Sequence, residues 1–123
     1  MITGAVNANL EARIPLLLQD ASGGNHHVDA VIDTGFSGFL TLPSALIASL
    51  NLAWLCRQQG LLADGSVQVF DVYTATVLWD GQSRIVEAER IDAVPLVGME
   101  MLHGFELRVK VARGGSVAID AAP

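Results

Sequence analysis

The sequence predicts an all-β protein, a small closed barrel or folded sheet with one or two short helices. Three observations favour this class. Apolar residues recur with a period of two in several short segments, glycine-containing turns separate those segments, and one stretch has the three-to-four spacing of a helix. At 123 residues the chain suits one hydrophobic core, so we expect residues 1–123 to form a single domain.

The first two predicted strands lead to an acidic residue. Even-numbered residues from 10 to 18 are apolar, and they alternate with the polar Glu11, Arg13 and Gln19, which predicts a half-buried strand. Pro15 has no amide hydrogen to donate, so we expect this strand at an edge of the sheet. A turn is expected at residues 20–25, and a second alternating strand, residues 28–32, ends directly before Asp33.

One helix is expected, at residues 43–52. Apolar residues recur there at spacings of three to four, namely Leu42, Leu46, Ile47 and Leu50. Pro43 suits the first turn of a helix, where its missing N–H leaves no hydrogen bond unmade. The helix is short, so we expect strands to build most of the fold.

An Asp-Gly pair, Asp64 and Gly65, predicts a hairpin turn of the type that needs positive φ. The strand-like run that follows, Val67–Trp79, is longer than a usual strand. Its apolar phase also slips, so we expect a bend or bulge near Phe70 and Asp71.

The second Asp-Gly pair, Asp80 and Gly81, predicts a hairpin into a strand at residues 85–91. Alternation gives that strand one apolar and one acidic face, formed by Val86 and Ala88 and by Glu87 and Glu89. A last hairpin is expected across the glycines at 114 and 115. It would pair Leu107, Val109 and Val111 with Val117 and Ile119.

Composition and charge exclude several classes of function. Hydrophobic residues make up 51% of the chain and charged residues 16%, which predicts a folded domain with an apolar patch left for a partner. The net charge of -6 lacks the basic surface that binds phosphates, so we expect no nucleic-acid partner and no anionic membrane. No apolar run reaches the roughly 18 residues of a membrane span.

The lack of a recognisable secretory signal and the single cysteine lead us to expect a cytoplasmic location. Residues 1–13 lack the basic and apolar regions of a secretory signal. The single cysteine, Cys56, cannot form an intrachain disulfide, which fits a reducing compartment.

The sharpest chemical feature is the segment VIDTGFSGF, residues 31–39, which sets Asp33 at the end of a core strand. Two carboxyl groups held close together cannot both stay ionised, so such a pair shares one proton. One member can then activate water while the other protonates a carbonyl group. Gly35 and Gly38 would let the backbone approach closely enough to bring in a second carboxylate.

Two motifs, in this order, resemble those of a known family. Asp33, Thr34 and Gly35 after a hydrophobic strand resemble the active-site signature of aspartic proteases. Residues 94–102, VPLVGMEML, are similar to the apolar-apolar-Gly segment and short helix of retropepsins. Over residues 10–111 the chain therefore resembles the retropepsin-like (clan AA) aspartic proteases, in their bacterial single-domain type.

The resemblance implies an aspartic endopeptidase that hydrolyses peptide or protein substrates with no metal or other cofactor. The chain holds one Asp-Thr-Gly turn, so the second aspartate must come from another protomer of a homodimer. By resemblance, Asp33 is catalytic, Thr34 hydrogen-bonds across the interface, and Gly35 lines the floor of the cleft.

The resemblance also implies substrate-binding residues. The family has a flap, a mobile hairpin that closes over bound peptide, and it falls here at Ala63, Asp64, Gly65 and Ser66. Phe36 stands where viral members carry a small residue, and Glu100 stands where Asn or Asp is common. The pocket shape, and with it the substrate preference, is therefore expected to differ from the viral enzymes.

Other reactive residues have simpler interpretations. His26 and His27 are adjacent and would point to opposite sides of a strand, so we expect surface positions rather than a metal site. Cys56 lacks the context of a thiol nucleophile and is expected to be a buried small hydrophobe. Solvated strand positions are expected for Asp29, Glu87, Glu89 and Asp92, and packing roles for Trp54, Trp79, Met99 and Met101.

Two alternatives to a homodimeric protease stay open. One is a protease-like module that binds or assembles extended peptides with little or no catalytic activity. The other is an obligate partner of a different protease-like chain. A protein that stays monomeric would favour either alternative over the homodimer.

Overall fold

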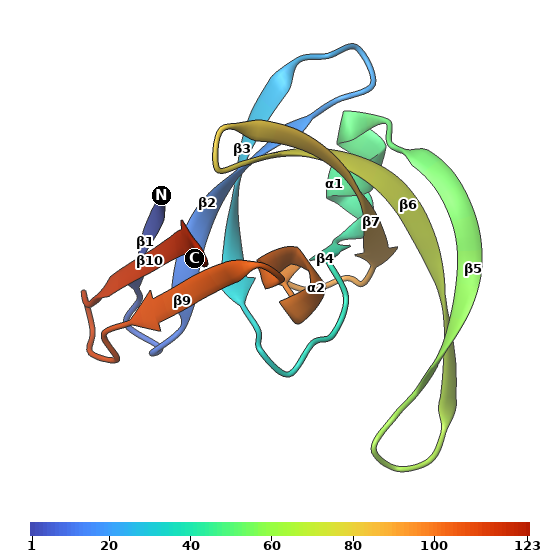
Figure 1. Ribbon diagram of the computed structural model, residues 1–123. Coiled ribbons are helices and arrows are strands. Elements are labelled where there is room, and N and C mark those ends of the chain that lie inside the picture. The colour runs from blue at the N-terminus through green and yellow to red at the C-terminus, as the bar shows by residue number, and fades with distance from the viewer.

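The computed structural model describes residues 1–123 as one ten-stranded sheet with two short helices (Figure 1). The strands are β1 (Ile2–Val6), β2 (Ala12–Gln19), β3 (Asn25–Ile32), β4 (Leu40–Leu42), β5 (Ala53–Leu61), β6 (Val67–Trp79), β7 (Gln82–Arg90), β8 (Leu96–Val97), β9 (Phe105–Val109) and β10 (Ser116–Ala121). The helices are α1 (Ser44–Leu50) and α2 (Met99–Leu102). Across the sheet the strands follow the order β5-β6-β7-β4-β8-β3-β2-β1-β10-β9. The predicted all-β class is confirmed.

An additional pairing folds the sheet back on itself. β6 pairs with β2, through Leu17 opposite Leu78 and Leu18 opposite Val77, as well as with β5 and β7. As a result β2, β3, β6 and β7 curve around a common interior (Figure 1). The largest side chains that fill this interior include Trp79, Ile14, Leu16, Leu18, Leu40, Leu42, Leu50 and Met101.

The prediction that Pro15 marks an edge strand is wrong. β2 lies inside the sheet, with β3 on one side and β1 and β6 on the other. β1 pairs with Ala12 and Arg13 and β6 pairs with residues 17–19, so Pro15 lies beside the gap between them. A missing amide hydrogen costs little where no neighbouring strand is present to accept it.

Local patterns located the first elements correctly. The strand predicted at residues 28–32 lies within β3, and the turn before it is closed by Asp20, whose Oδ1 accepts hydrogen bonds from the N–H groups of Ser22 and Gly24. The helix predicted at residues 43–52 contains α1. It ends at Asn51, which adopts a left-handed φ of 52° and caps the last turn.

Both Asp-Gly hairpins are confirmed. Gly65 has a φ of 86°, and the two-residue turn at Asp80 and Gly81 has φ values of 50° and 81°. β7 follows that second turn and alternates as predicted, with Val86 and Ala88 buried.

The irregularity in the long hairpin lies on β5 rather than on β6. The register between these strands shifts between Trp54 and Cys56. Phe70 and Asp71 pair regularly with their partners on β5, so the bulge predicted near them is wrong.

The C-terminal hairpin has the predicted register over most of its length. Val109 pairs with Val117, and Leu107 pairs with Ile119. β9 ends at Val109, so Val111 falls outside the pair, contrary to prediction, and is 74% exposed.

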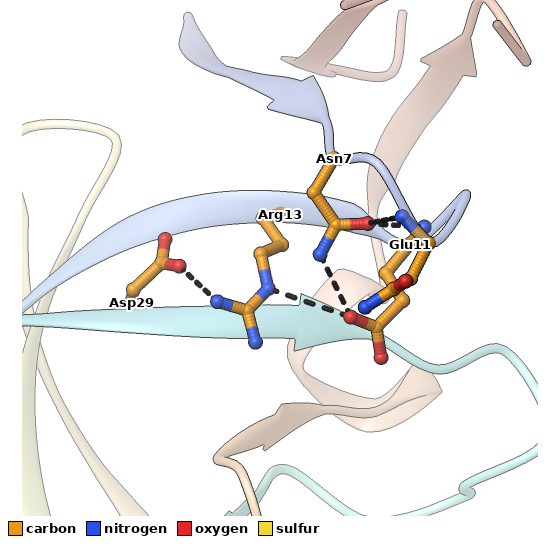
Figure 2. A network of polar contacts seen from close by, with 5 residues as sticks. Asn7, Glu11, Arg13 and Asp29 are labelled. Carbon is orange, nitrogen blue, oxygen red and sulfur yellow. Dashed lines mark hydrogen bonds and ion pairs between the residues drawn. The ribbon is translucent and has the colours of Figure 1, made fainter. Parts of the chain in front are cut away.

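A polar network ties the turn between β1 and β2 to β3 (Figure 2). Asn7 Oδ1 accepts hydrogen bonds from the N–H groups of Asn9 and Glu11, while Asn7 Nδ2 donates to the Glu11 carboxylate at 2.8 Å. Arg13 Nη1 lies 2.6 Å from Asp29 Oδ2. Asp29 is exposed as predicted, and its role in the fold is this surface ion pair.

The remaining residues divide between surface and core. His26 and His27 are exposed as predicted. Cys56 is half-buried rather than buried, because β5 is an edge strand. Of the four expected packing residues, Trp79 and Met101 are buried, whereas Trp54 and Met99 are 57% and 49% exposed. Neither helix has the length and apolar character that a membrane crossing requires.

Candidate active site

The turn that carries Asp33 is fixed by a crossing of segments far apart in the sequence. β8 comes late in the chain but lies between β3 and β4, parallel to β3 and antiparallel to β4. The connection from β3 to β4, residues 33–39, therefore passes across the end of β8. The Asp33 N–H donates to the Val97 carbonyl at 2.9 Å, and the Gly98 N–H donates to the Phe39 carbonyl at 2.9 Å.

Gly98 makes this crossing possible. The residues after it continue the contact, since the Met99 N–H donates to the Phe36 carbonyl at 2.8 Å and the Glu100 N–H donates to the Gly38 carbonyl at 3.1 Å. A Cβ atom on Gly98 would collide with the carbonyl oxygens of Phe36 and Gly38 and with the Phe36 ring. The close approach of the two backbones therefore requires glycine here.

The Asp33 carboxylate is half-buried and held by its own turn. Its Oδ1 accepts a hydrogen bond from the Gly35 N–H at 3.0 Å, and the Phe36 N–H donates to the Asp33 carbonyl at 3.1 Å. Oδ2 has no hydrogen-bond partner within the chain. Capping of the turn thus uses one carboxylate oxygen and leaves the other free for water or substrate.

Thr34 and Ser37 border a hollow of about 490 Å³ that extends over α2 and β9. Its apolar lining comes from Met99, Leu102, Phe105 and Leu107. Thr34 is exposed, so its hydroxyl lies at a surface that a second molecule can reach.

A smaller hollow of about 270 Å³ also borders the turn, at residues 37–39, and is acidic. It is lined by Ser37, Gly38, Phe39, Gln58, Val72, Glu87, Glu89 and Glu100. Burial raises the pKa of Glu89, and the negative charge of Glu87 adds to this effect. Glu87 is exposed as predicted, but Glu89 is half-buried beside the turn rather than on an ordinary solvated face.

We expect Glu89→Gln to stabilise the protein at neutral pH by about 0.5 kcal/mol, a value kept small because water screens a half-buried charge. A raised pKa in the folded state means that stability is lost as pH rises through the titration of Glu89. The variant should therefore be more stable than the wild type at pH 7, and the two proteins should be equally stable below the ordinary carboxyl pKa of 4.5. Urea unfolding at both pH values measures this difference. A loss of stability at pH 7 would contradict it.

The predicted flap residues form the exposed tip of the β5–β6 hairpin, which projects beyond the body of the sheet (Figure 1). Asp64 Oδ1 accepts hydrogen bonds from the Ser66 hydroxyl at 2.6 Å and the Ser66 N–H at 2.9 Å, which lowers the pKa of Asp64. Ala63 and Gly65 complete the tip. No hydrogen bond or ion pair joins this tip to Asp33 within one chain.

Asp71 braces the hairpin farther from its tip. Its Oδ1 accepts hydrogen bonds from Trp54 Nε1 at 3.1 Å and Arg57 Nε at 3.3 Å, and Arg90 lies 3.7 Å from Oδ2. These contacts lower the pKa of Asp71, with the Trp54 hydrogen bond contributing most. Asp71 thus links the projecting hairpin of β5 and β6 to Arg90 at the end of β7.

The structure brings four of the predicted site residues into one turn, Asp33, Thr34, Gly35 and Phe36, and leaves the predicted flap residues at a separate tip. The Phe36 ring packs against Gly38 and Gly98 within the crossing. Sequence reasoning missed the buried Thr41, whose Oγ1 accepts a hydrogen bond from the Leu96 N–H at 3.1 Å and ties β4 to β8. No signal in the apolar strand around Thr41 points to that role.

The segment of residues 33–39 crosses the end of β8, in a sheet that folds back on itself, and this arrangement can be compared with solved structures. A crystal structure of a retropepsin-like aspartic protease from Rickettsia conorii is similar to this chain with a TM-score of 0.61 and 17% sequence identity. The likeness covers 98% of this chain and 90% of that protein. No family model and no curated protein matches the sequence. The similarity shows the fold, an all-β folded sheet of retropepsin type.

Proposed function

We propose that the protein is an aspartic endopeptidase that works as a homodimer of single-domain protomers, each formed by residues 1–123. The observation that carries this proposal is the Asp33 carboxylate, half-buried on a hydrogen-bonded turn with one oxygen unpartnered. The chain has one such turn, so a pair of carboxylates requires two chains. The single Cys56 favours action in a reducing cytoplasm.

In the proposed reaction two Asp33 carboxyl groups share one proton. The ionised member takes a proton from a water molecule, whose oxygen attacks the peptide carbonyl carbon. The protonated member donates its proton to the carbonyl oxygen. The tetrahedral intermediate then collapses, the C–N bond breaks, and the leaving nitrogen takes up a proton, so neither a covalent enzyme intermediate nor a cofactor is needed.

The residues around Asp33 have supporting roles in this proposal. Thr34 lies next to the carboxylate and would hydrogen-bond across the interface, while Gly35 forms the floor of the cleft and Phe36 shapes it. The exposed hairpin tip would close over a bound peptide and exclude water. The apolar side chains that it would lay over the substrate include Leu61, Leu62, Val67 and Val69, which are 46% to 77% exposed.

Mixing wild-type protein with Asp33→Asn tests whether one site draws on two chains. After subunit exchange in an equal mixture, about a quarter of random dimers hold two Asp33 residues, so activity per total chain should fall to about a quarter of the pure wild-type value. Independent monomers would instead retain half. The measurement is the cleavage rate on a peptide from a library screen, with the particle mass followed by light scattering.

The same experiment separates the proposal from a peptide-binding module. A dimer that binds library peptides and cleaves none of them would replace the protease by the binding module. Cleavage that falls only to half would show that each chain works alone. In that case the shared pair of aspartates would be wrong.

A further inference from the structure

The indole N–H of Trp79 is a buried hydrogen-bond donor that the chain leaves without an acceptor. Trp79 is 1% exposed, and its Nε1 has no partner. Buried polar atoms are nearly always hydrogen-bonded, and one that is not has lost its bonds to water without replacement. The other unpartnered buried side-chain atom is Nε of Arg13, which still lies 3.8 Å from the Glu11 carboxylate. Trp79 therefore points to an acceptor from outside the chain.

Trp79 borders a hollow of about 350 Å³ at the end of the β6–β7 hairpin. In its wall the rings of Trp79 and Phe105 meet edge to face, with their centroids 5.8 Å apart. The hollow lies next to the larger one beside Thr34, because His103 and Phe105 line both. It includes no residue of the turn that carries Asp33, so it is a separate feature of the fold.

The strand register places a cationic side chain on the inner face of β7, at this hollow. Arg84 lies opposite Val77, and Gln82 lies opposite Trp79, so both share the face of the buried Val86. Arginine is uncommon on a core-facing position, because a buried charge needs a partner. Arg84 is half-buried there and lines the hollow.

No carboxylate of the chain pairs with Arg84. Its one hydrogen bond goes from Nη1 to the Met101 carbonyl, a long contact of 3.5 Å. The single carboxylate that lines the hollow belongs to Asp80, which lies 2.7 Å from the Met1 ammonium group instead. Most N–H donors of the Arg84 guanidinium are thus free, and their planar arrangement suits the two oxygens of a carboxylate.

The rest of the lining favours a carboxylate attached to an apolar group. Gln82 and His103 stand at the exposed rim, where their side chains can donate hydrogen bonds. Phe105 and Ala121 add apolar wall. A metal cation does not fit, because the unpaired charge is that of Arg84. Phosphate carries more than one negative charge near neutral pH, which a single free guanidinium balances less well than it balances a carboxylate.

We propose that this hollow binds a small carboxylate ligand, with the carboxylate on Arg84, the indole N–H of Trp79 as a further donor, and the apolar part of the ligand against Phe105. The site is distinct from the proposed protease site, and its test needs no cleavage reaction.

Benzoate is the probe, and benzamide is its uncharged counterpart of the same shape. The chain has two tryptophans, so two indole N–H signals are expected in a ¹H–¹⁵N NMR spectrum, and the one that persists in Trp54→Phe belongs to Trp79. Benzoate should shift the Trp79 signal saturably, with a dissociation constant on the order of 1 mM, as a ligand of this size allows. Benzamide should leave that signal in place.

Arg84→Gln should weaken benzoate binding about tenfold or more, because it removes a charge-assisted hydrogen bond. Lys110→Gln is the matched control. It makes the same change in net charge at an exposed position outside the hollow, so its benzoate affinity should equal that of the wild type. The dispersion of the remaining NMR signals verifies that each variant is folded.

Three results would overturn the proposal. A Trp79 signal that benzoate leaves unmoved at concentrations far above the millimolar range would mean that no carboxylate reaches the indole. Equal shifts with benzamide, or an Arg84→Gln protein that binds benzoate as tightly as the wild type, would reduce the hollow to an apolar pocket. Inorganic phosphate that shifts the signal at lower concentration than benzoate does would replace the carboxylate by a phosphate ligand.

Discussion

Asp33→Asn should reduce peptide cleavage about 10³-fold or more, because an amide can neither accept the proton of the attacking water nor share one with the opposing carboxyl group. The fold should survive. Asn keeps the oxygen that accepts the Gly35 N–H bond of 3.0 Å, so the turn retains its internal contact. The measurements are kcat/KM on a peptide found by library screening, the midpoint of urea unfolding, and the particle mass.

Asp29→Asn is the matched control for this substitution. Asp29 lies on β3, the strand that leads into Asp33, and it is exposed, with Arg13 on the protein surface as its partner. Four residues along a strand span about 13 Å, which excludes it from the Asp33 site. It should keep nearly full activity. An Asp33→Asn protein that also keeps full activity would contradict the paired-aspartate mechanism.

The local elements of this fold could be predicted because their signals are local. The left-handed residues at Asp80 and Gly81 and the alternation of β7 follow from a few neighbouring residues. β1 and β5 gave no such signal. β5 is half-buried or exposed along its length and lacks an apolar face, and β1 is defined by β2 and β10, its partners far along the chain.

The errors share one physical cause. The edge assignment for Pro15 failed because β1 and β6 approach β2 from distant parts of the sequence and leave a gap beside that residue. The bulge was expected on β6 but lies on its partner, since either strand of a pair can absorb a slip in register. The sequence indicates that Pro15 lacks a hydrogen-bonding neighbour and that the long hairpin contains a bulge. It does not show which distant segment leaves the gap or which strand carries the bulge.

The candidate site also has a part that local sequence patterns predict and a part that they do not. Asp33, Thr34 and Gly35 stand out because a charged residue ends an apolar strand before glycines. The insertion of β8 between β3 and β4 has no local signature, so the hollow shared by Thr34 and Leu107 could not be predicted. Glu89 was assigned to solvent for that reason too, because its neighbour across the hollow is the turn at residues 37–39.

Gly98→Ala should destabilise the protein by about 3 kcal/mol or more and abolish cleavage with it. The cause is steric and lies in backbone atoms, which cannot rotate away as a flexible side chain would. A Cβ atom at this position would lie 2.8 Å from the Phe36 carbonyl oxygen and closer still to that of Gly38. The turn must shift to relieve this contact, and the Asp33 carboxylate moves with it. Urea unfolding and kcat/KM on the same peptide measure both effects.

Gly23→Ala separates this steric effect from the general cost of replacing glycine. Gly23 has a φ of 86°, and a Cβ atom there would meet nothing within 4 Å. The free energy of unfolding of that variant should fall by about 1 kcal/mol, because alanine is strained in the left-handed conformation. Its activity should be kept, because its turn does not touch the crossing. If Gly98→Ala proved no more costly than Gly23→Ala, the crossing would be loose. The position of Asp33 would then not depend on the close approach of residues 36–38 to the end of β8.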